Sequence, residues 1–279
     1  MTHILLVAAD LLREAASRKW FLALGIGITL VLGTLGLTLK MDVVDGALAA
    51  TRLFGRAFAH SDIKSVDVAL RPVFRASAYL VFYGGIAFGI VACADFGPSL
   101  LSPGRIEHLL SLPVRRFELL AGTFLGVLVL ALCGALYGAG GLAVILGFKT
   151  GVWTARPVLA ALLASLSFAS LYACMISAAV FVRSAALSAA VGMTLFIGGI
   201  VAGYRTQLAP MFDAGIGREA FKAVTLFLPR LSALADAGAD LASSAPLETP
   251  VLGSLLAGIA LFGAASLLVG AWHFEQRDF

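Results

Sequence analysis

Six long apolar stretches constrain this chain more than any other feature of its sequence. A helix that crosses the hydrocarbon of a bilayer needs about 20 apolar residues. Charged residues make up only 13% of the chain, too few to cover a soluble globule of which 60% is hydrophobic. We therefore predict an all-α integral membrane protein whose transmembrane domain, residues 20–272, has six helices. The predicted spans are residues 20–39, 76–97, 118–147, 157–181, 185–204 and 251–272.

An even number of spans places both termini on the same side of the membrane. The basic pairs Arg18–Lys19 and Arg115–Arg116 adjoin the first and third spans, and the positive-inside rule gives weight to such flanking clusters while long translocated loops contribute little. We expect cytoplasmic termini, with residues 273–279 as a cytoplasmic tail. Because Lys and Arg fall between the apolar runs rather than in one stripe, we expect contacts with lipid headgroups and none with nucleic acid.

The first 19 residues form a separate element. Apolar residues recur at helical spacing over residues 3–17, and charged residues take the other face. This pattern predicts an amphipathic helix that lies in the membrane interface ahead of the first span. The charged residues that we assign to this interfacial helix and its junction are Asp10, Arg13, Glu14, Arg18 and Lys19.

Two outer segments carry weaker helical patterns. In residues 40–75, the apolar residues Leu53, Phe54, Ala57 and Phe58 predict a second helix that lies on the membrane surface. In residues 205–250, the apolar run 220–228 is too short to span and predicts a re-entrant or interfacial helix.

Some residues inside the spans invite a chemical interpretation. Cys93, Cys133 and Cys174 sit singly in three spans, which favours small buried side chains over a disulfide or a metal site. Asp95 is a carboxylate close to the end of the second span, where it marks the interface or, less often, forms a proton site. The pairs Gly85/Gly89 and Gly134/Gly138 have GxxxG spacing, and we expect them to pack helices within the bundle rather than to form a dimer seam.

The motifs of soluble enzymes are missing. The stretch 147–150 lacks the glycine that precedes lysine in a phosphate-binding loop, and the chain contains neither HExxH nor GxSxG. We expect no enzyme activity, cofactor or metal on this chain. A transporter without its own nucleotide loop or charge relay needs an external motor.

The loop between the second and third spans is the most informative segment. Ser102 suits a helix N-cap, Pro103 suits the first helical position, and Pro113 stops the helix. The apolar residues between them share one face. The pattern predicts a short amphipathic helix, which either docks to a partner or lies on the membrane.

The same loop resembles that of the type-2 ABC transporter permeases. The residues that match are Gly104, Ile106, Glu107, Leu109, Leu110, Pro113, Val114, Arg116, Glu118 and Gly122. The amphipathic lead 10–19 and the ending 273–279 are also similar to that family, whereas Ser102–Pro103, Arg105 and Thr123 depart from its pattern.

The resemblance implies half of a transport machine. It implies a permease subunit of an ATP-driven exporter in a bacterial inner membrane, paired with a second permease chain and with a separate ABC ATPase that carries ATP and Mg. The loop between spans 2 and 3 would be the coupling helix. The residues to which the resemblance and the loop pattern assign ATPase coupling are Gly104, Arg105, Ile106, Glu107, His108, Leu109, Leu110, Pro113, Arg115 and Arg116. The alternatives are a stand-alone secondary transporter and a non-transporting scaffold subunit of an ATPase complex.

Overall fold

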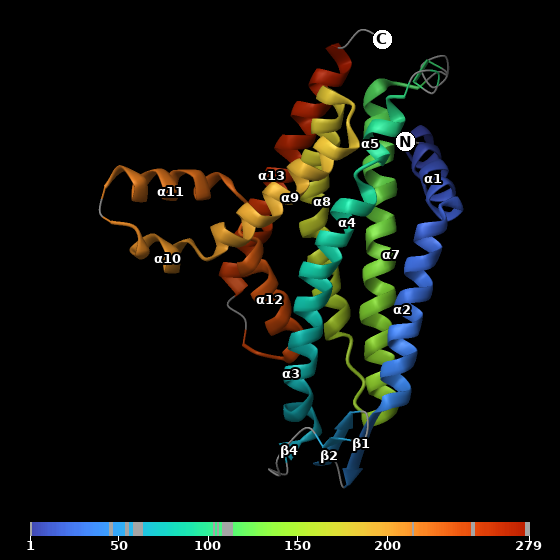
Figure 1. The fold of residues 1–279 in the computed structure, drawn as a ribbon, viewed down its shortest axis with the longest axis vertical. Coiled ribbons are helices and arrows are strands. Elements are labelled where there is room, and N and C mark those ends of the chain that lie inside the picture. Colours follow the sequence, from blue (N-terminus) through green and yellow to red (C-terminus); the bar gives the residue numbers. More distant parts are fainter. Residues whose placement is uncertain are drawn as a thin grey trace.

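The computed structural model describes residues 2–44, 47–53, 56–57, 64–102, 104, 106–107, 114–213, 215–246 and 249–276 (Figure 1). This part of the chain is predominantly helical, and six of its helical segments are long and apolar enough to cross a membrane. They are Phe21–Thr38, Leu70–Leu100, Arg116–Thr150, Arg156–Val182, Ala185–Gly203 and Thr249–Gln276. The prediction of a helical multi-pass protein with six candidate spans is confirmed.

The helices follow one another in the predicted order. Helix α1 (Thr2–Ser17) precedes α2 (Lys19–Thr38). The second span is built from α3 (Val66–Tyr79), the π-helix η1 (Leu80–Gly84), α4 (Gly85–Cys93) and α5 (Phe96–Leu100). The remaining spans are α7 (Arg116–Thr150), α8 (Arg156–Val182), α9 (Ala185–Gly203) and α13 (Thr249–Gln276).

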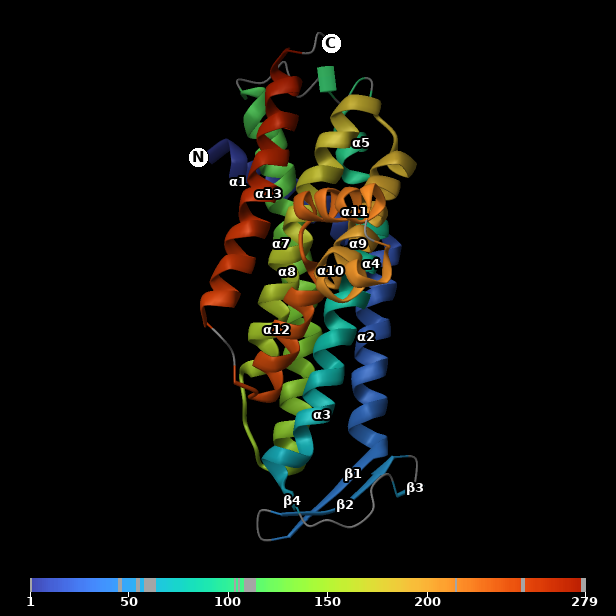
Figure 2. The ribbon, with the colours of Figure 1, turned by 90° about the vertical axis from the view of Figure 1, so that its left-hand side faces the viewer.

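Helix α8 lies at the centre of the bundle, where it contacts α7, α9, α13 and the short helix α12 (Leu231–Ser243) (Figure 2). Its buried surface is rich in Ala and Ser, which let neighbouring helices approach closely. The hydroxyls of Ser165, Ser167 and Ser177 donate to carbonyls four residues earlier, at 2.9, 2.9 and 2.7 Å. These polar groups are therefore satisfied inside an apolar bundle.

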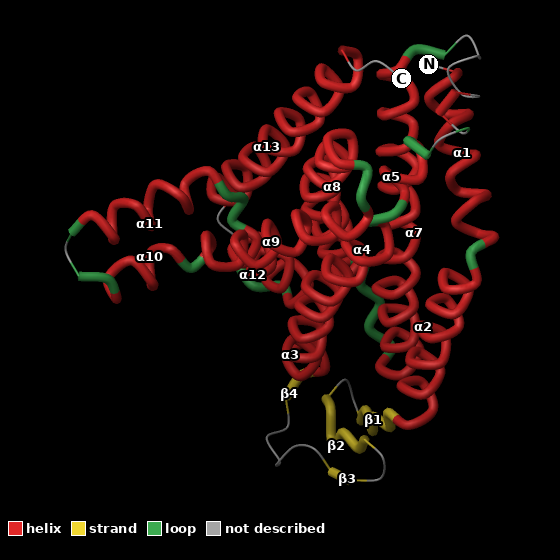
Figure 3. Tube along the Cα trace, turned by 45° about the horizontal axis from the view of Figure 1, so that its top comes forward, coloured by secondary structure: helices red, strands yellow, loops and turns green. Residues whose placement is uncertain are grey.

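A small antiparallel sheet follows α2. It consists of β1 (Leu39–Val44), β2 (Ala47–Leu53), β3 (Arg56–Ala57) and β4 (Lys64–Ser65), and β2 pairs with the other three (Figure 3). The helix predicted from Leu53 to Phe58 is therefore wrong: Leu53 pairs with Leu39, Ala57 pairs with Arg52, and Phe54 and Phe58 lie outside the described residues. Six residues of helical spacing are too few to nucleate a stable helix, whereas hairpin pairing satisfies the backbone.

The segment between α9 and α13 forms two different structures. Helix α10 (Arg205–Leu208), the turn η2 (Ala209–Met211) and α11 (Ile216–Phe227) make an arm that projects sideways from the bundle (Figure 1). The predicted helix over 220–228 lies in α11, whose apolar residues Val224, Leu226 and Phe227 are exposed. The buried short helix of this segment is α12, which the pattern did not single out.

The two GxxxG pairs have unequal surroundings. A Cβ added at Gly89 would lie 2.8 Å from the Phe168 ring, so this glycine packs within the bundle as expected. Around Gly85, Gly134 and Gly138, no atom of the described residues outside their own helical turns would lie within 4 Å of such a Cβ. The expectation of packing inside the bundle is therefore wrong for Gly134/Gly138.

Candidate functional site

The predicted loop and the N-terminal helix meet at one end of the bundle. The C-terminal end of α13, the start of α7, α5 and α1 all lie there, opposite the strands (Figure 1). Of the loop, the structure describes Ser102, Gly104, Ile106, Glu107 and 114–116. The other predicted coupling residues, Arg105, His108, Leu109, Leu110 and Pro113, lie outside the described residues.

The loop does not begin as the sequence predicts. Gly104 has a φ of +81°, a left-handed conformation that interrupts a helix starting at Ser102. The Ser102 hydroxyl donates to the Ser99 carbonyl at 2.9 Å and so closes α5. Helical residues are found after this turn, at Ile106 and Glu107, of which Ile106 is buried and Glu107 is exposed. The glycine of the motif therefore supplies the turn.

The two arginines after the loop fix the start of α7. The backbone N–H of Arg115 donates to the Glu118 carboxylate at 3.0 Å, which caps the helix. The Arg116 guanidinium donates to the carbonyls of Phe274 and Glu275 at 3.4 and 3.1 Å. A cation at the C-terminal end of a helix is favourable because the last carbonyls carry partial negative charge. Arg116 thereby joins the third span to the sixth.

Two glycines allow α1 to lie directly on α7. A Cβ added at Gly122 would lie 2.6 Å from Val7 Cβ and 2.9 Å from the Ile4 carbonyl oxygen. At Gly126 it would lie 3.1 Å from the Ala8 carbonyl oxygen. No larger residue fits at Gly122 without displacing α1. The predicted apolar face of the N-terminal helix thus packs on protein, through the buried residues Ala8, Leu11 and Ala15.

Arg18 connects the end of α1 to the end of the second span. Its guanidinium donates to Glu14 at 2.7 Å and to Asp95 at 3.0 Å, and it lies 4.6 Å from the centre of the Phe96 ring. Burial opposes the charged guanidinium, but the hydrogen bonds and charges of Glu14 and Asp95 outweigh it and raise the pKa of Arg18. Asp95 is half exposed, which fits a carboxylate that ends a span.

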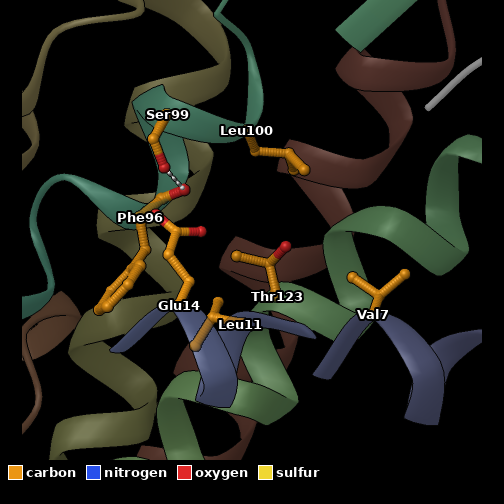
Figure 4. A pocket seen from close by; sticks show the side chains of 7 residues that line it. All are labelled: Val7, Leu11, Glu14, Phe96, Ser99, Leu100 and Thr123. Atoms are coloured by element: carbon orange, nitrogen blue, oxygen red, sulfur yellow. Dashed lines mark hydrogen bonds between the residues drawn. The ribbon is translucent and has the colours of Figure 1, made fainter. Parts of the chain in front are cut away.

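The other predicted residues of the N-terminal helix do not join this network. Asp10 and Arg13 are exposed on α1, and the side chain of Lys19 lies outside the described residues. A cavity of about 20 Å³ lies beside Glu14, between α1, α5 and α7 (Figure 4). Its lining residues are Val7, Leu11, Glu14, Phe96, Ser99, Leu100 and Thr123. This volume holds about one water molecule, so the junction is a mechanical contact rather than a ligand site.

A second polar cluster joins α3 to α12. The Tyr79 hydroxyl donates to Asp236 at 2.7 Å, and Arg75 lies 3.5 Å from both the Tyr79 hydroxyl and Asp240. The π-helix η1 begins directly after Tyr79, and the Tyr83 ring stacks on that of Tyr79 with a centroid distance of 6.1 Å. A π-helical turn often accompanies a functional site.

The sequence analysis missed this second cluster. Arg75 and Tyr79 are four residues apart, as are Asp236 and Asp240, so each pair shares one face of its helix. That matched spacing was the available signal. It was hidden because Asp236 and Asp240 fall in a segment that is not apolar over a full span.

The structure offers no metal centre among the residues it describes. Within them, no group of three or more His, Cys, Asp or Glu side chains could hold a metal ion. The three cysteines are free; Cys93 is buried and Cys174 partly buried, whereas Cys133 is exposed, contrary to expectation.

Comparison with known proteins gives no relative. No protein-family model matches the chain, and no curated protein matches it. The fold defines the class, a helical multi-pass membrane protein.

Proposed function

We propose that this chain is the membrane-spanning subunit of a type-2 ABC exporter in a bacterial inner membrane. Two permease chains would pair, with both termini in the cytoplasm, and each would receive a separate ABC ATPase on residues 102–116. ATP and Mg would be bound by that partner. The interfacial helix α1 would lie at the cytoplasmic surface.

The observation that carries the proposal is the set of contacts that joins the loop end to three spans. Arg18 links α5, which leads into the loop, to the junction of α1 and α2. On the other side of the loop, Arg116 links α7 to α13. A displacement of the loop would therefore move the first, third and sixth spans together, as an external motor requires.

The motif residues that the structure describes have definite roles in this arrangement. Gly104 makes the turn into the loop, Glu118 caps α7, and Gly122 admits α1. Thr123, which departs from the family pattern, is buried under α1 with its hydroxyl bonded to the Leu119 carbonyl at 2.9 Å. A lysine there would bury an unpaired charge.

Removal of the loop tests the proposal. We would replace residues 102–112 by a Gly/Ser linker and co-express the chain with a P-loop ATPase encoded beside it. We expect the ATPase to stop co-purifying while the chain still inserts in the membrane. The matched control replaces 244–248, which lies between α12 and α13, and should retain the ATPase. If the ATPase is retained by both variants, the coupling role is wrong; retention together with ATP turnover that moves nothing would favour the scaffold alternative.

The α3–α12 cluster favours a second candidate, an ion-coupled secondary transporter. Such proteins carry acidic residues beside interrupted helices, and here Asp236 faces Tyr79 at the start of a π-helix. The test uses the purified chain in liposomes with a proton or sodium gradient and no ATPase. Gradient-driven uptake that is lost in Asp236→Asn would support this candidate, and uptake that needs ATP and the ATPase would exclude it.

A further inference from the structure

A cavity of about 560 Å³ opens between α10 and α11, in the arm that projects from the bundle. Stacking of Phe212 on Phe221, with ring centres 4.8 Å apart, holds the two sides of the arm together. The cavity is large enough for part of an amphiphile. Its lining residues are Arg205, Thr206, Ala209, Pro210, Arg218, Glu219, Lys222, Ala223 and Leu226.

The lining has more positive than negative charge. Lys222 and Glu219 neutralise each other through an ion pair of 2.7 Å. Arg205 and Arg218 have no carboxylate partner among the described residues, and the Nε of Arg218 is buried without a hydrogen-bond partner there. A buried guanidinium N–H without an acceptor is costly. The cavity therefore lacks an anion that would complete it.

A further arginine adds to this surplus. Burial lowers the pKa of Arg230, and the neighbouring charge of Arg205 lowers it further. Two guanidinium groups that repel each other would both be stabilised by one anion placed near them.

The apolar surface of the arm indicates where the anion comes from. Ile216 is 91% exposed and Phe227 is 78% exposed, and Val224 and Leu226 are also largely exposed. In a membrane protein such a surface contacts acyl chains. We propose that the cavity between α10 and α11 binds an anionic phospholipid, with the phosphate at Arg205 and Arg218 and the acyl chains along Ala223 and Leu226. The inference does not depend on the proposed function.

The test compares two lipids that differ only in headgroup charge. The purified chain is equilibrated with equal amounts of palmitoyl-oleoyl phosphatidylglycerol and phosphatidylcholine, and bound lipid is measured by native mass spectrometry. We expect preferential retention of phosphatidylglycerol. Arg205→Gln and Arg218→Gln should each weaken it about fivefold, since a basic residue contributes about 1 kcal/mol to the binding of an anionic headgroup. Arg156→Gln, an exposed arginine at the start of α8, is the matched control and should change nothing.

Two further arms keep the result decisive. Glu219→Gln removes the carboxylate of the cavity and should strengthen phosphatidylglycerol binding, the opposite direction from loss of folding. Inorganic phosphate at millimolar concentration should leave the lipid bound, whereas displacement by it would assign the cavity to a soluble anion and overturn the proposal. Equal retention of both lipids by the unmodified chain, or the same loss in Arg156→Gln as in Arg218→Gln, would also overturn it.

Discussion

Helices α8 and α2 are equally apolar and yet occupy opposite environments. Both have a mean hydropathy of 2.0 over their best 18-residue window, but 78% of that window is buried in α8 and none of it in α2. Hydropathy therefore identifies a span without saying whether the span faces protein or lipid. The difference lies in small residues and where they meet a neighbour.

The contact between α8 and α13 shows how close the central packing is. A Cβ added at Gly263 of α13 would lie 3.0 Å from the Ser170 Cα on α8, and Ser177 donates to the Ser266 carbonyl at 2.7 Å. On α2, by contrast, a Cβ added at Gly27 would meet no atom of the described residues within 4 Å. Glycine is thus required by packing in one helix and not in the other.

The largest expected effect is that of Gly263→Leu. Its side chain would collide with the α8 backbone, which cannot rotate away, so we expect unfolding to become easier by about 3 kcal/mol, the upper end of the range for overpacking. Gly27→Leu is the matched substitution on α2, where we expect less than about 0.5 kcal/mol. The free energy of unfolding would be measured by titration with SDS in mixed micelles. Equal losses for the two variants would remove the distinction between α8 and α2.

A smaller effect is expected where α1 lies on α7. Gly122→Leu would push against Val7 and the Ile4 carbonyl, but α1 can move away, so we expect a loss of about 1–2 kcal/mol, the lower part of the overpacking range. Faster hydrogen exchange in α1, with the rest of the bundle unchanged, would report its release. Gly134→Leu on the same helix meets open space and is the control; release of α1 by that variant would argue against a specific contact at Gly122.

The centre of α8 also holds a polar atom that contributes nothing favourable. The Tyr172 hydroxyl is buried without a hydrogen-bond partner among the described residues, while its ring stacks with Phe124 and Phe168. Because an unsatisfied buried hydroxyl costs free energy, we expect Tyr172→Phe to stabilise the protein by about 1 kcal/mol. The same SDS titration measures it. A destabilisation of that size would mean that the hydroxyl has a partner in the membrane-embedded protein.

The spans were predictable because hydropathy over 20 residues is a property of the sequence alone. The strands were not, because pairing of Leu39 with Leu53 depends on where the chain leaves α2. Helix α12 was missed for a related reason: its 13 residues are too short for a span, and burial against α3 and α8 rather than length makes it part of the bundle.

The candidate site was predictable only in part. The motif located Gly104, Arg116 and Gly122 at positions with clear structural roles, although the helix start at Ser102 was wrong because Gly104 turns the chain. That Gly122 receives α1 could not be foreseen, since the sequence does not say which glycine faces which helix. The contact of Tyr79 with Asp236 joins residues 157 positions apart, beyond any local pattern.

The smallest expected effect concerns what holds α2 to the bundle. The Thr29 hydroxyl donates to the Gly25 carbonyl at 2.7 Å and lies 2.7 Å from the Tyr137 hydroxyl of α7. A hydroxyl has one hydrogen to donate, so Tyr137 must be the donor between the helices. Removing the two groups singly and together, as Thr29→Val and Tyr137→Phe, should give a coupling free energy of about 0.6 kcal/mol, typical of hydrogen bonds between membrane helices. A coupling above about 2 kcal/mol, beyond what such bonds reach, would show that α2 is anchored as firmly as α8 and that its exposed surface misrepresents its attachment.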